Sequence, residues 1–276
     1  MRSRWFRPRS ADNRGDVWIM GVLNCTPDSF SDGGSFINVE AAVSHGLAMW
    51  KQGARLIDVG GESTRPGAAQ VPLAEELERV IPVVRQLTGL GCAVSIDTMK
   101  AEVMRQAIAA GAVMVNDVSA LDHEPESLAV VAQSGVDVCL MHMQGNPQTM
   151  QQRPQYDHVV DEVAAFFTER IELALAAGIK QSSILLDPGI GFGKRLEDNL
   201  TLIRSLDVFK TRFGMPVLLG VSRKSFLGLL TGCGVEDREI ETAVAGAIGI
   251  AHGADILRVH DVEVQQRAIR VASALT

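Results

Sequence analysis

The sequence predicts an α/β fold with a single (β/α)8 barrel, because short apolar runs alternate with helical segments and the length suits one such barrel. Apolar residues recur at helical spacing in segments such as 39–52, 74–87, 101–110 and 159–177. The chain has 276 residues, and a typical barrel has roughly 250. The apolar runs, which we interpret as strands, occupy residues 18–23, 56–57, 94–96, 114–115, 138–141, 184–186, 217–221 and 256–259.

A polar residue follows each of these eight runs. In a barrel of parallel strands the carboxyl ends meet at one rim, where the loops to the following helices carry the chemistry. The residues at the strand ends are therefore the candidate active-site residues. In chain order they are Asn24, Asp58, Asp97, Asn116, His142, Asp187, Ser222 and His260.

Composition and charge agree with one enzyme-sized domain. Hydrophobic residues make up 46% and charged residues 21%, which fits one barrel domain at 17–276. Residues 1–16 are rich in arginine and poor in apolar residues, so we expect them to form an N-terminal arm. The net charge of −7 argues against nucleic acid or an anionic membrane as a partner. The sequence has neither the ~20 apolar residues of a membrane helix nor a secretory signal, so we expect a cytoplasmic protein.

The four cysteines are predicted to be reduced and mostly buried. They are far apart in the chain and show no Cys-x-x-Cys spacing, which argues against a zinc site or a disulfide framework. They are Cys25, Cys92, Cys139 and Cys233.

The segments after the first and second runs are predicted to be long mobile loops. Residues 25–34 and 60–67 are rich in glycine, proline, serine and aspartate, which favour turns. Two such loops on one rim would close over a substrate and exclude water. The alternative is ordinary loop composition with no such role.

Eight motifs identify a resemblance that covers residues 19–262. In order and spacing, the motifs resemble those of the bacterial dihydropteroate synthase family. They read GVLNCTPDSFSDGG, IDVGGESTRPGA, SIDTMK, VNDVSA, MHMQGNPQTMQ, DPGIGFGK, GVSRKSFLG and RVHDV.

The resemblance implies a TIM barrel that acts as a transferase, usually as a homodimer. Its members join 6-hydroxymethyl-7,8-dihydropterin diphosphate to p-aminobenzoate, giving 7,8-dihydropteroate and diphosphate, and sulfonamides compete with p-aminobenzoate. For the dimer surface we expect the apolar faces of the helices predicted at 236–252 and 262–274.

A pterin presents adjacent N–H donors, which suit a carboxylate that accepts two hydrogen bonds at once. We expect Asp187 to take this edge and Asp97 with Asn116 to reach the remaining ring nitrogens. For any one aspartate the alternative is a helix N-cap or an ion pair. Around the ring we expect Lys224 on the carbonyl oxygen and N5, Met141 as a wall, Phe192 over the ring face, and Arg258.

The glycines of the DPGIGFGK motif, which ends at Lys194, superficially suggest a nucleotide loop. The spacing matches neither the P-loop nor the dinucleotide fingerprint. We expect the glycines to allow close backbone approach and to place Phe192.

The diphosphate is expected near the first and last strands. Arg258 and His260 flank Val259, and strand alternation would put both side chains on one face. The alternative for His260 is a neighbour of the helix start at Asp261. Asn24, Thr64 and Arg65 would complete the clamp, Arg65 through bidentate geometry. Mg²⁺ is expected as the cofactor, with Asn24 as its one named protein ligand.

For p-aminobenzoate we expect a pocket built partly from the two loops, in which Ser222 at a helix start receives the carboxylate. A plain serine N-cap is the alternative. The pocket residues are Phe30, Thr64, Pro66, Phe192, Ser222 and Lys224.

Catalysis is expected to follow an SN1-like route, in which diphosphate leaves before the weak aniline nucleophile attacks. Asp32 would orient or support the methylene group or the incoming amine. The expected catalytic residues are Asp32, Arg65, Asp97, Lys224, Arg258 and His260.

Two other functions would use the same barrel. A pterin-dependent methyltransferase domain would share the pterin residues, but it has no use for a diphosphate clamp. A non-catalytic pterin-binding subunit should lack Arg65, Lys224 or the pair Arg258 and His260, and all of these are present.

Overall fold

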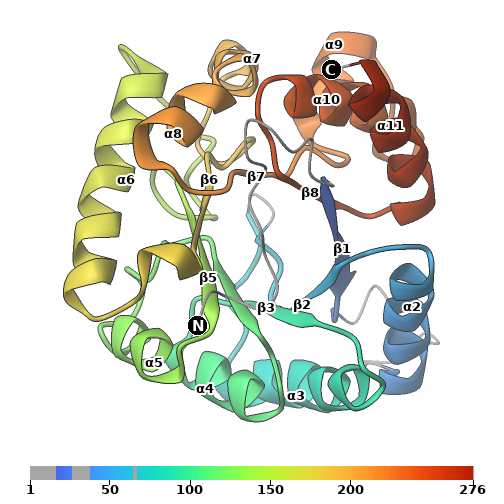
Figure 1. Cartoon of the computed structure of the whole chain (residues 1–276), viewed down its shortest axis with the longest axis vertical. Helices are drawn as coiled ribbons and strands as arrows, with labels where there is room; N and C mark the ends of the chain where they lie inside the picture. The colour runs from blue at the N-terminus through green and yellow to red at the C-terminus, as the bar shows by residue number, and fades with distance from the viewer. Residues whose placement is uncertain (1–16, 27–37, 65–66, 276) are drawn as a thin grey trace.

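The structure, a computed structural model, describes residues 17–26, 38–64 and 67–275, which form a barrel of eight parallel strands inside a ring of helices (Figure 1). The strand order is β6-β5-β4-β3-β2-β1-β8-β7, and a bridge between Leu186 and Val217 closes the barrel. The predicted fold is thus confirmed. The strands are β1 (Trp18–Asn24), β2 (Leu56–Gly60), β3 (Val94–Asp97), β4 (Met114–Asp117), β5 (Asp137–Met141), β6 (Ile184–Asp187), β7 (Leu218–Leu219) and β8 (Ile256–Val259).

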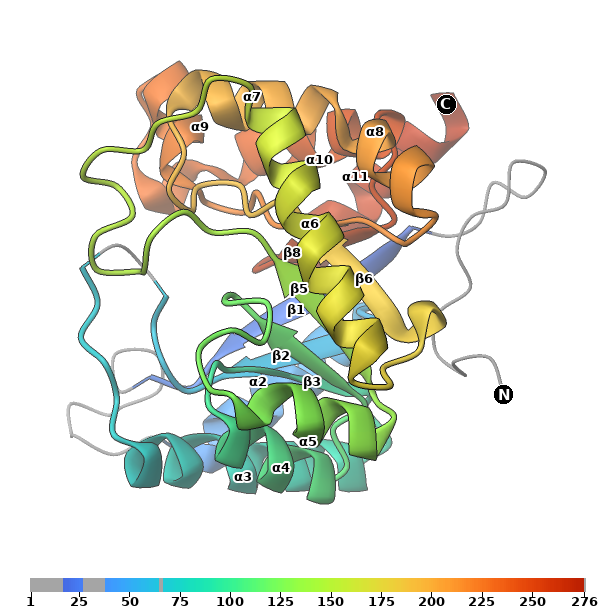
Figure 2. The same cartoon turned by 90° about the vertical axis from the view of Figure 1, so that its left-hand side faces the viewer.

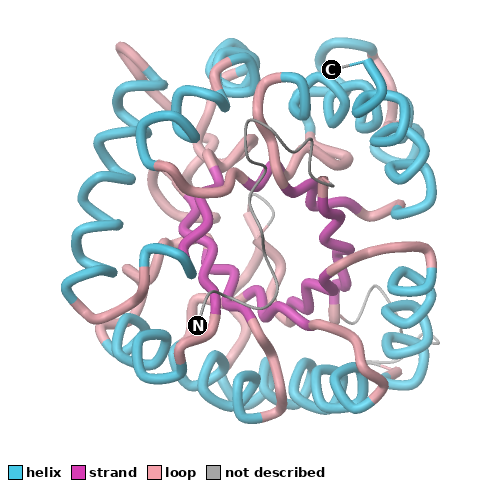
Figure 3. Tube along the Cα trace, viewed as in Figure 1, coloured by secondary structure: helices cyan, strands magenta, loops and turns pink. Residues whose placement is uncertain are grey.

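The helices surround the strands on all sides, as Figures 2 and 3 also show. The four helical segments predicted above agree with α2, α3, α4 and α6 to within two residues at each end. Short 3-10 turns at Gln181–Ser183 and Val235–Asp237 precede β6 and α10. The helices are α2 (Val39–Lys51), α3 (Leu73–Gly89), α4 (Ala101–Ala109), α5 (Glu126–Ser134), α6 (Val159–Ala176), α7 (Leu196–Arg204), α8 (Leu206–Phe213), α9 (Ser225–Thr231), α10 (Glu239–Ala251) and α11 (Val262–Leu275).

Two strands differ most from the prediction. The second strand continues to Gly60, so Asp58 lies within β2 and not at its end. A carboxylate is tolerated inside this buried strand because Arg258 of β8 pairs with it. The seventh strand is shorter than 217–221. Val217, the first residue of the predicted run, lies outside β7 and donates its backbone N–H to the carboxylate of Asp255.

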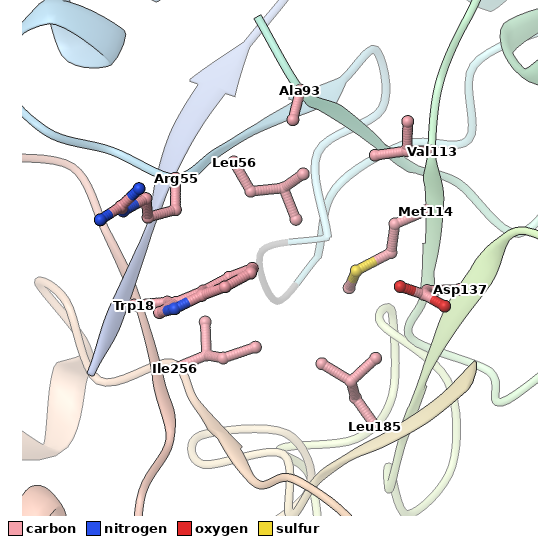
Figure 4. A pocket seen from close by; sticks show the side chains of 9 residues that line it. All are labelled: Trp18, Arg55, Leu56, Ala93, Val113, Met114, Asp137, Leu185 and Ile256. Carbon is pink, nitrogen blue, oxygen red and sulfur yellow. The ribbon is translucent and has the colours of Figure 1, made fainter. Parts of the chain in front are cut away.

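The barrel floor is filled with apolar side chains, so chemistry is confined to the opposite rim. Met20, Leu185 and Leu218 lie in this layer and are buried. A cavity of about 20 Å³ remains among the floor residues, as Figure 4 shows, which is room for about one water molecule. The residues that line it are Trp18, Arg55, Leu56, Ala93, Val113, Met114, Asp137, Leu185 and Ile256.

Two of the remaining general predictions concern residues that the structure describes. All four cysteines are free thiols, three of them buried and Cys233 partly so. Among the described residues, no helix has the length and apolar character needed to cross a bilayer. Residues 1–16 lie outside the described part of the chain, so the division into an arm and a barrel domain stays a prediction.

Candidate active site

Arg258 brings together side chains from four strands at the carboxyl rim. Its Nε donates to Asp58 Oδ2 at 2.7 Å, and its Nη2 donates to Asp97 Oδ2 at 2.6 Å. Asn116 Nδ2 donates to the same Asp58 oxygen at 2.9 Å. One guanidinium from β8 therefore joins β2 and β3, and Asp58 extends the network to β4.

This cluster carries more acceptors than donors. Asp58 Oδ1 and Asp97 Oδ1 are buried and have no hydrogen-bond partner among the described residues. Burial raises the pKa of Asp97 to about 7, with Arg258 opposing the rise and Asp58, Asp117 and Glu76 adding to it. Because unpaired buried acceptors are costly, the cluster suits a ligand that presents N–H groups.

Asp187 provides a second carboxylate at the end of β6. Its Oδ1 accepts the N–H of Gly189 at 2.7 Å. Gly189 has a φ of +69°, and a Cβ there would lie 1.9 Å from the carbonyl oxygen of His142, so only glycine fits. Burial raises the pKa of Asp187, whereas the charges of Lys224, Arg258 and Lys194 lower it.

Phe192 and Lys224 contact each other at the same rim, and the charge of Lys224 acts on Asp187. Lys224 Nζ lies 4.0 Å from the centre of the Phe192 ring, a cation–π contact. Phe192 also packs in a buried apolar group with Val118, Met141 and Met150. The structure thus joins Met141, Phe192 and Lys224, which the sequence placed around one ligand.

Ser222 and His260 are hydrogen-bonded to each other. The backbone N–H of His260 donates to Ser222 Oγ at 3.2 Å, and Oγ lies 2.9 Å from His260 Nδ1. In a neutral imidazole the Ser222 hydroxyl donates a hydrogen bond to Nδ1, and Nε2 carries the ring hydrogen. Asn24 ends the neighbouring strand β1, which pairs with β8 up to Val259, and its side chain is partly exposed.

The root of the second loop is anchored by charged groups. Lys100 forms ion pairs with Glu62 and with the buried Glu76. Arg79 Nη1 donates to the carbonyl oxygen of Gly61 at 2.7 Å. The partly exposed Thr64 follows this root.

Comparison with known proteins identifies the family. The family model described as pterin binding enzyme matches residues 20–260. A dihydropteroate synthase of Synechocystis sp. is 49% identical over 94% of this chain and 90% of its own length. The enzyme of Escherichia coli K12 is 48% identical over 93% of this chain and 90% of its length.

The chain belongs to the dihydropteroate synthase family. Among solved structures, the Yersinia pestis dihydropteroate synthase with a sulfonamide drug complex has a TM-score of 0.89 at 45% identity, with 94% of each chain covered. The Xanthomonas albilineans enzyme with 4-aminobenzoic acid has a TM-score of 0.88 at 48% identity, covering 95% of this chain and 94% of that one.

The family and the enzyme class expected from the motifs are therefore confirmed. Neither the pterin-dependent methyltransferase nor the non-catalytic pterin-binding subunit is favoured by these relatives.

Most of the predicted site residues of this family member lie at the rim, and the other four lie in parts of the chain that the structure does not describe. Phe30, Asp32, Arg65 and Pro66 are outside the described residues, so their roles and the mobility of both loops stay predictions.

Two residues at the site were given no role by the sequence. Asp58 was a candidate because it follows an apolar run, but nothing near it in the sequence indicates its partners, Arg258 and Asn116. Lys194 ends a glycine-rich motif, where a lysine is ordinarily exposed, yet its side chain is buried.

Proposed function

We propose that this protein joins 6-hydroxymethyl-7,8-dihydropterin diphosphate to p-aminobenzoate and releases diphosphate. The observation that carries the proposal is the pair of unpartnered buried oxygens of Asp58 and Asp97, together with the buried carboxylate of Asp187, because these acceptors match the donor-rich edge of a pterin. The name of the family agrees, and one Xanthomonas albilineans relative was solved in complex with 7,8-dihydropteroate, at 45% identity and a TM-score of 0.85.

In this proposal the pterin ring lies between the carboxylates and the aromatic wall. Asp187 accepts two N–H bonds, Asp97 and Asn116 take the remaining ring nitrogens, and Lys224 donates to the carbonyl oxygen and N5. Arg258 holds the two inner carboxylates and contributes positive charge toward the diphosphate. Met141 and Phe192 exclude water from the ring.

The diphosphate would lie toward Asn24 and His260, with Thr64 and Arg65 from the second loop. Asn24 offers a partly exposed amide oxygen, a donor type that Mg²⁺ accepts. Within the described ranges there is no group of three or more His, Cys, Asp or Glu side chains suited to a metal. An ion that takes most of its ligands from diphosphate and water fits such a site. When bound, Mg²⁺ would neutralise charge on the leaving group.

Catalysis would then rest on stabilising a departing anion, in an SN1-like route without a covalent enzyme intermediate. Positive charge from Arg65, Arg258 and Lys224, together with His260, lowers the barrier to departure of the diphosphate. The p-aminobenzoate carboxylate would lie at Ser222 and Lys224, with its ring beside Phe30, Thr64, Pro66 and Phe192. Sulfonamides would occupy the same position. Asp32 would orient the methylene group or the amine.

A homodimer and a cytoplasmic location complete the proposal. An apolar groove of about 380 Å³ lies between α7, α9 and α10, lined by residues that include Phe226, Leu230 and Val244. On this face Ile240 is 77% exposed and Leu230 is 53% exposed, and this amount of exposed apolar surface indicates an interface. A second copy would cover this face through a twofold axis. The groove involves α10, as expected from the sequence, but α7 and α9 in place of α11.

The test is a reaction of the purified protein with the pterin diphosphate, Mg²⁺ and p-aminobenzoate. We expect dihydropteroate and diphosphate in equal amounts. The Asp187→Asn variant should bind a pterin analogue about 30- to 1,000-fold more weakly, because an amide donor would face N–H groups at a cost of roughly 2–4 kcal/mol. Asp161→Asn, at an exposed position of α6, is the control. An inactive wild-type protein that binds no pterin would contradict the proposal.

A further inference from the structure

Lys194 is a buried lysine beside the pterin-binding residues. Its side chain is only 3% exposed, although an ammonium group is costly to bury unless it is fully hydrogen-bonded. Its Nζ lies 3.0 Å from the carbonyl oxygen of Phe192 and 3.2 Å from that of His142. A third contact, at 3.0 Å, reaches His142 Nδ1.

These three contacts match the three donors of an ammonium group. Burial and then the charge of Lys194 lower the pKa of His142 to about 3, so the imidazole is neutral. Its Nδ1 then accepts a hydrogen bond from the Lys194 ammonium group, and Nε2 carries the ring hydrogen. Each ammonium proton therefore has one acceptor in the protein.

The contacts join two loops that shape the pterin pocket. His142 follows β5, whereas Phe192 and the Asp187 partner Gly189 belong to the loop after β6. The loops touch through their backbones, since a Cβ at Gly193 would lie 2.5 Å from the carbonyl oxygen of Gln144. Tyr156 also donates to the carbonyl oxygen of Gly193, at 2.8 Å.

We infer that Lys194 is a positioning residue for pterin binding, whose ammonium group ties the loop carrying Phe192 and Gly189 to the loop after β5. The inference rests on the proposed function, because it assigns the pterin to Asp187 and Phe192. Lys194 does not contact the ligand in this arrangement. It acts through Phe192, which packs against Lys224, and through Gly189, which holds the Asp187 carboxylate.

The charge of Lys194 also acts on Asp187. The groups that face Asp187 are Lys224, Arg258 and Lys194, all of which lower its pKa against the effect of burial, and the thiol of Cys139 on β5. Burial lowers the pKa of Lys194 to about 7, Lys224 lowers it further, and Asp187 and Asp198 oppose the change. Lys194, which also faces His142, is therefore charged on the acid side of neutrality, where Asp187 takes up its proton. Without the Lys194 charge the pKa of Asp187 rises. Asp187 then takes up its proton at a higher pH on acidification, and the protonated carboxyl group can no longer accept two N–H bonds from the pterin.

The test compares Lys194→Met with Lys180→Met, an exposed lysine just before β6. Binding of a pterin analogue without diphosphate is measured by calorimetry from pH 5 to 9. We expect Lys194→Met to bind at least tenfold more weakly and to lose affinity at higher pH than wild type on acidification. Lys180→Met should behave as wild type.

A second pair of variants tests the contact if Lys194→Met does not fold. His142→Asn keeps an acceptor near the position of Nδ1 and should bind the pterin analogue within threefold of wild type. His142→Phe removes that acceptor and should bind at least fivefold more weakly, with an unshifted pH profile because Lys194 keeps its charge.

Wild-type affinity and pH profile in folded Lys194→Met, or wild-type affinity in His142→Phe, would overturn the inference. Failure of the wild-type protein itself to bind the pterin would overturn the proposed function instead.

Discussion

Arg223 has a backbone conformation that few residues other than glycine adopt. Its φ is +57°, and it lies between Ser222 and Lys224. Its N–H donates to Thr242 Oγ1 at 3.1 Å, and Arg238 donates to its carbonyl oxygen at 3.2 Å. The beginning of α10 thus imposes the turn that positions two site residues, at a strain of about 1 kcal/mol.

Substitutions at Arg223 should separate backbone conformation from side-chain charge. Arg223→Gly suits the left-handed region and should keep KM values within threefold of wild type, with stability changed by less than about 1 kcal/mol because the lost ion pair with Glu239 offsets the relief of strain. Arg223→Val should lose about 1–3 kcal/mol of stability and raise KM for both substrates. Urea unfolding and steady-state kinetics measure both. Equal behaviour of the two variants would contradict the role of the turn.

Asp97 makes stability depend on pH. Its pKa is about 7 in the folded protein, against 3.8 for an ordinary aspartate. Between about pH 4 and 7 the folded protein therefore holds a proton that the unfolded chain has lost, and the contribution of this group to stability falls as the pH rises. Asp97→Asn cannot ionise, so its stability relative to wild type should increase from pH 4 to 8 by a few kcal/mol. Denaturant melts at both pH values test this, and a pH-independent difference would refute it.

At the scale of elements, each functional side chain depends on a contact between strands or between loops. Arg258 on β8 holds carboxylates from β2 and β3, and Lys100 before α4 holds the root of the loop after β2. The second loop therefore begins from a fixed base. Its proposed function, as a clamp on the leaving group, can be tested separately from pterin binding.

Arg65→Lys should impair turnover while leaving the pterin pocket intact. Lysine keeps the charge but lacks the bidentate geometry that suits diphosphate. We expect kcat to fall at least tenfold, whereas the affinity for a pterin analogue without diphosphate changes less than threefold, because the interaction is made with the leaving group alone. Calorimetry beside steady-state kinetics makes the comparison. A similar loss in both would assign Arg65 to pterin binding or to loop structure.

For the whole molecule, the proposed dimer predicts the outcome of a surface substitution. Ile240→Glu places a charge on the most exposed part of the groove and should convert the dimer into monomers, measured by light scattering during gel filtration. Leu173→Glu, at an exposed position of α6, is the matched control and should stay dimeric. A wild-type protein that is monomeric at micromolar concentration would exclude the interface.

The architecture of this protein was readable from the sequence because local patterns report burial. Strands and helices repeat their apolar residues with different periods, and the barrel needs eight units in order. The same logic located Asn24, Asp97 and Asp187 at the ends of their strands and Asn116 one residue before the end of β4, all on one rim. The motifs added the family, since they include the loop residues as well as the strand ends.

Closure of the barrel, in contrast, decided which side chains pair across its interior and how burial shifts their pKa values. Arg258 on β8 and Asp58 on β2 are 200 positions apart in the chain. They meet because only β1 separates these two strands in the barrel and both side chains face the interior. The pKa of Asp97 and the burial of Lys194 depend on this enclosure. A sequence pattern records which side of its own strand or helix a residue occupies. Which residue faces it across the barrel is decided only when the sheet closes.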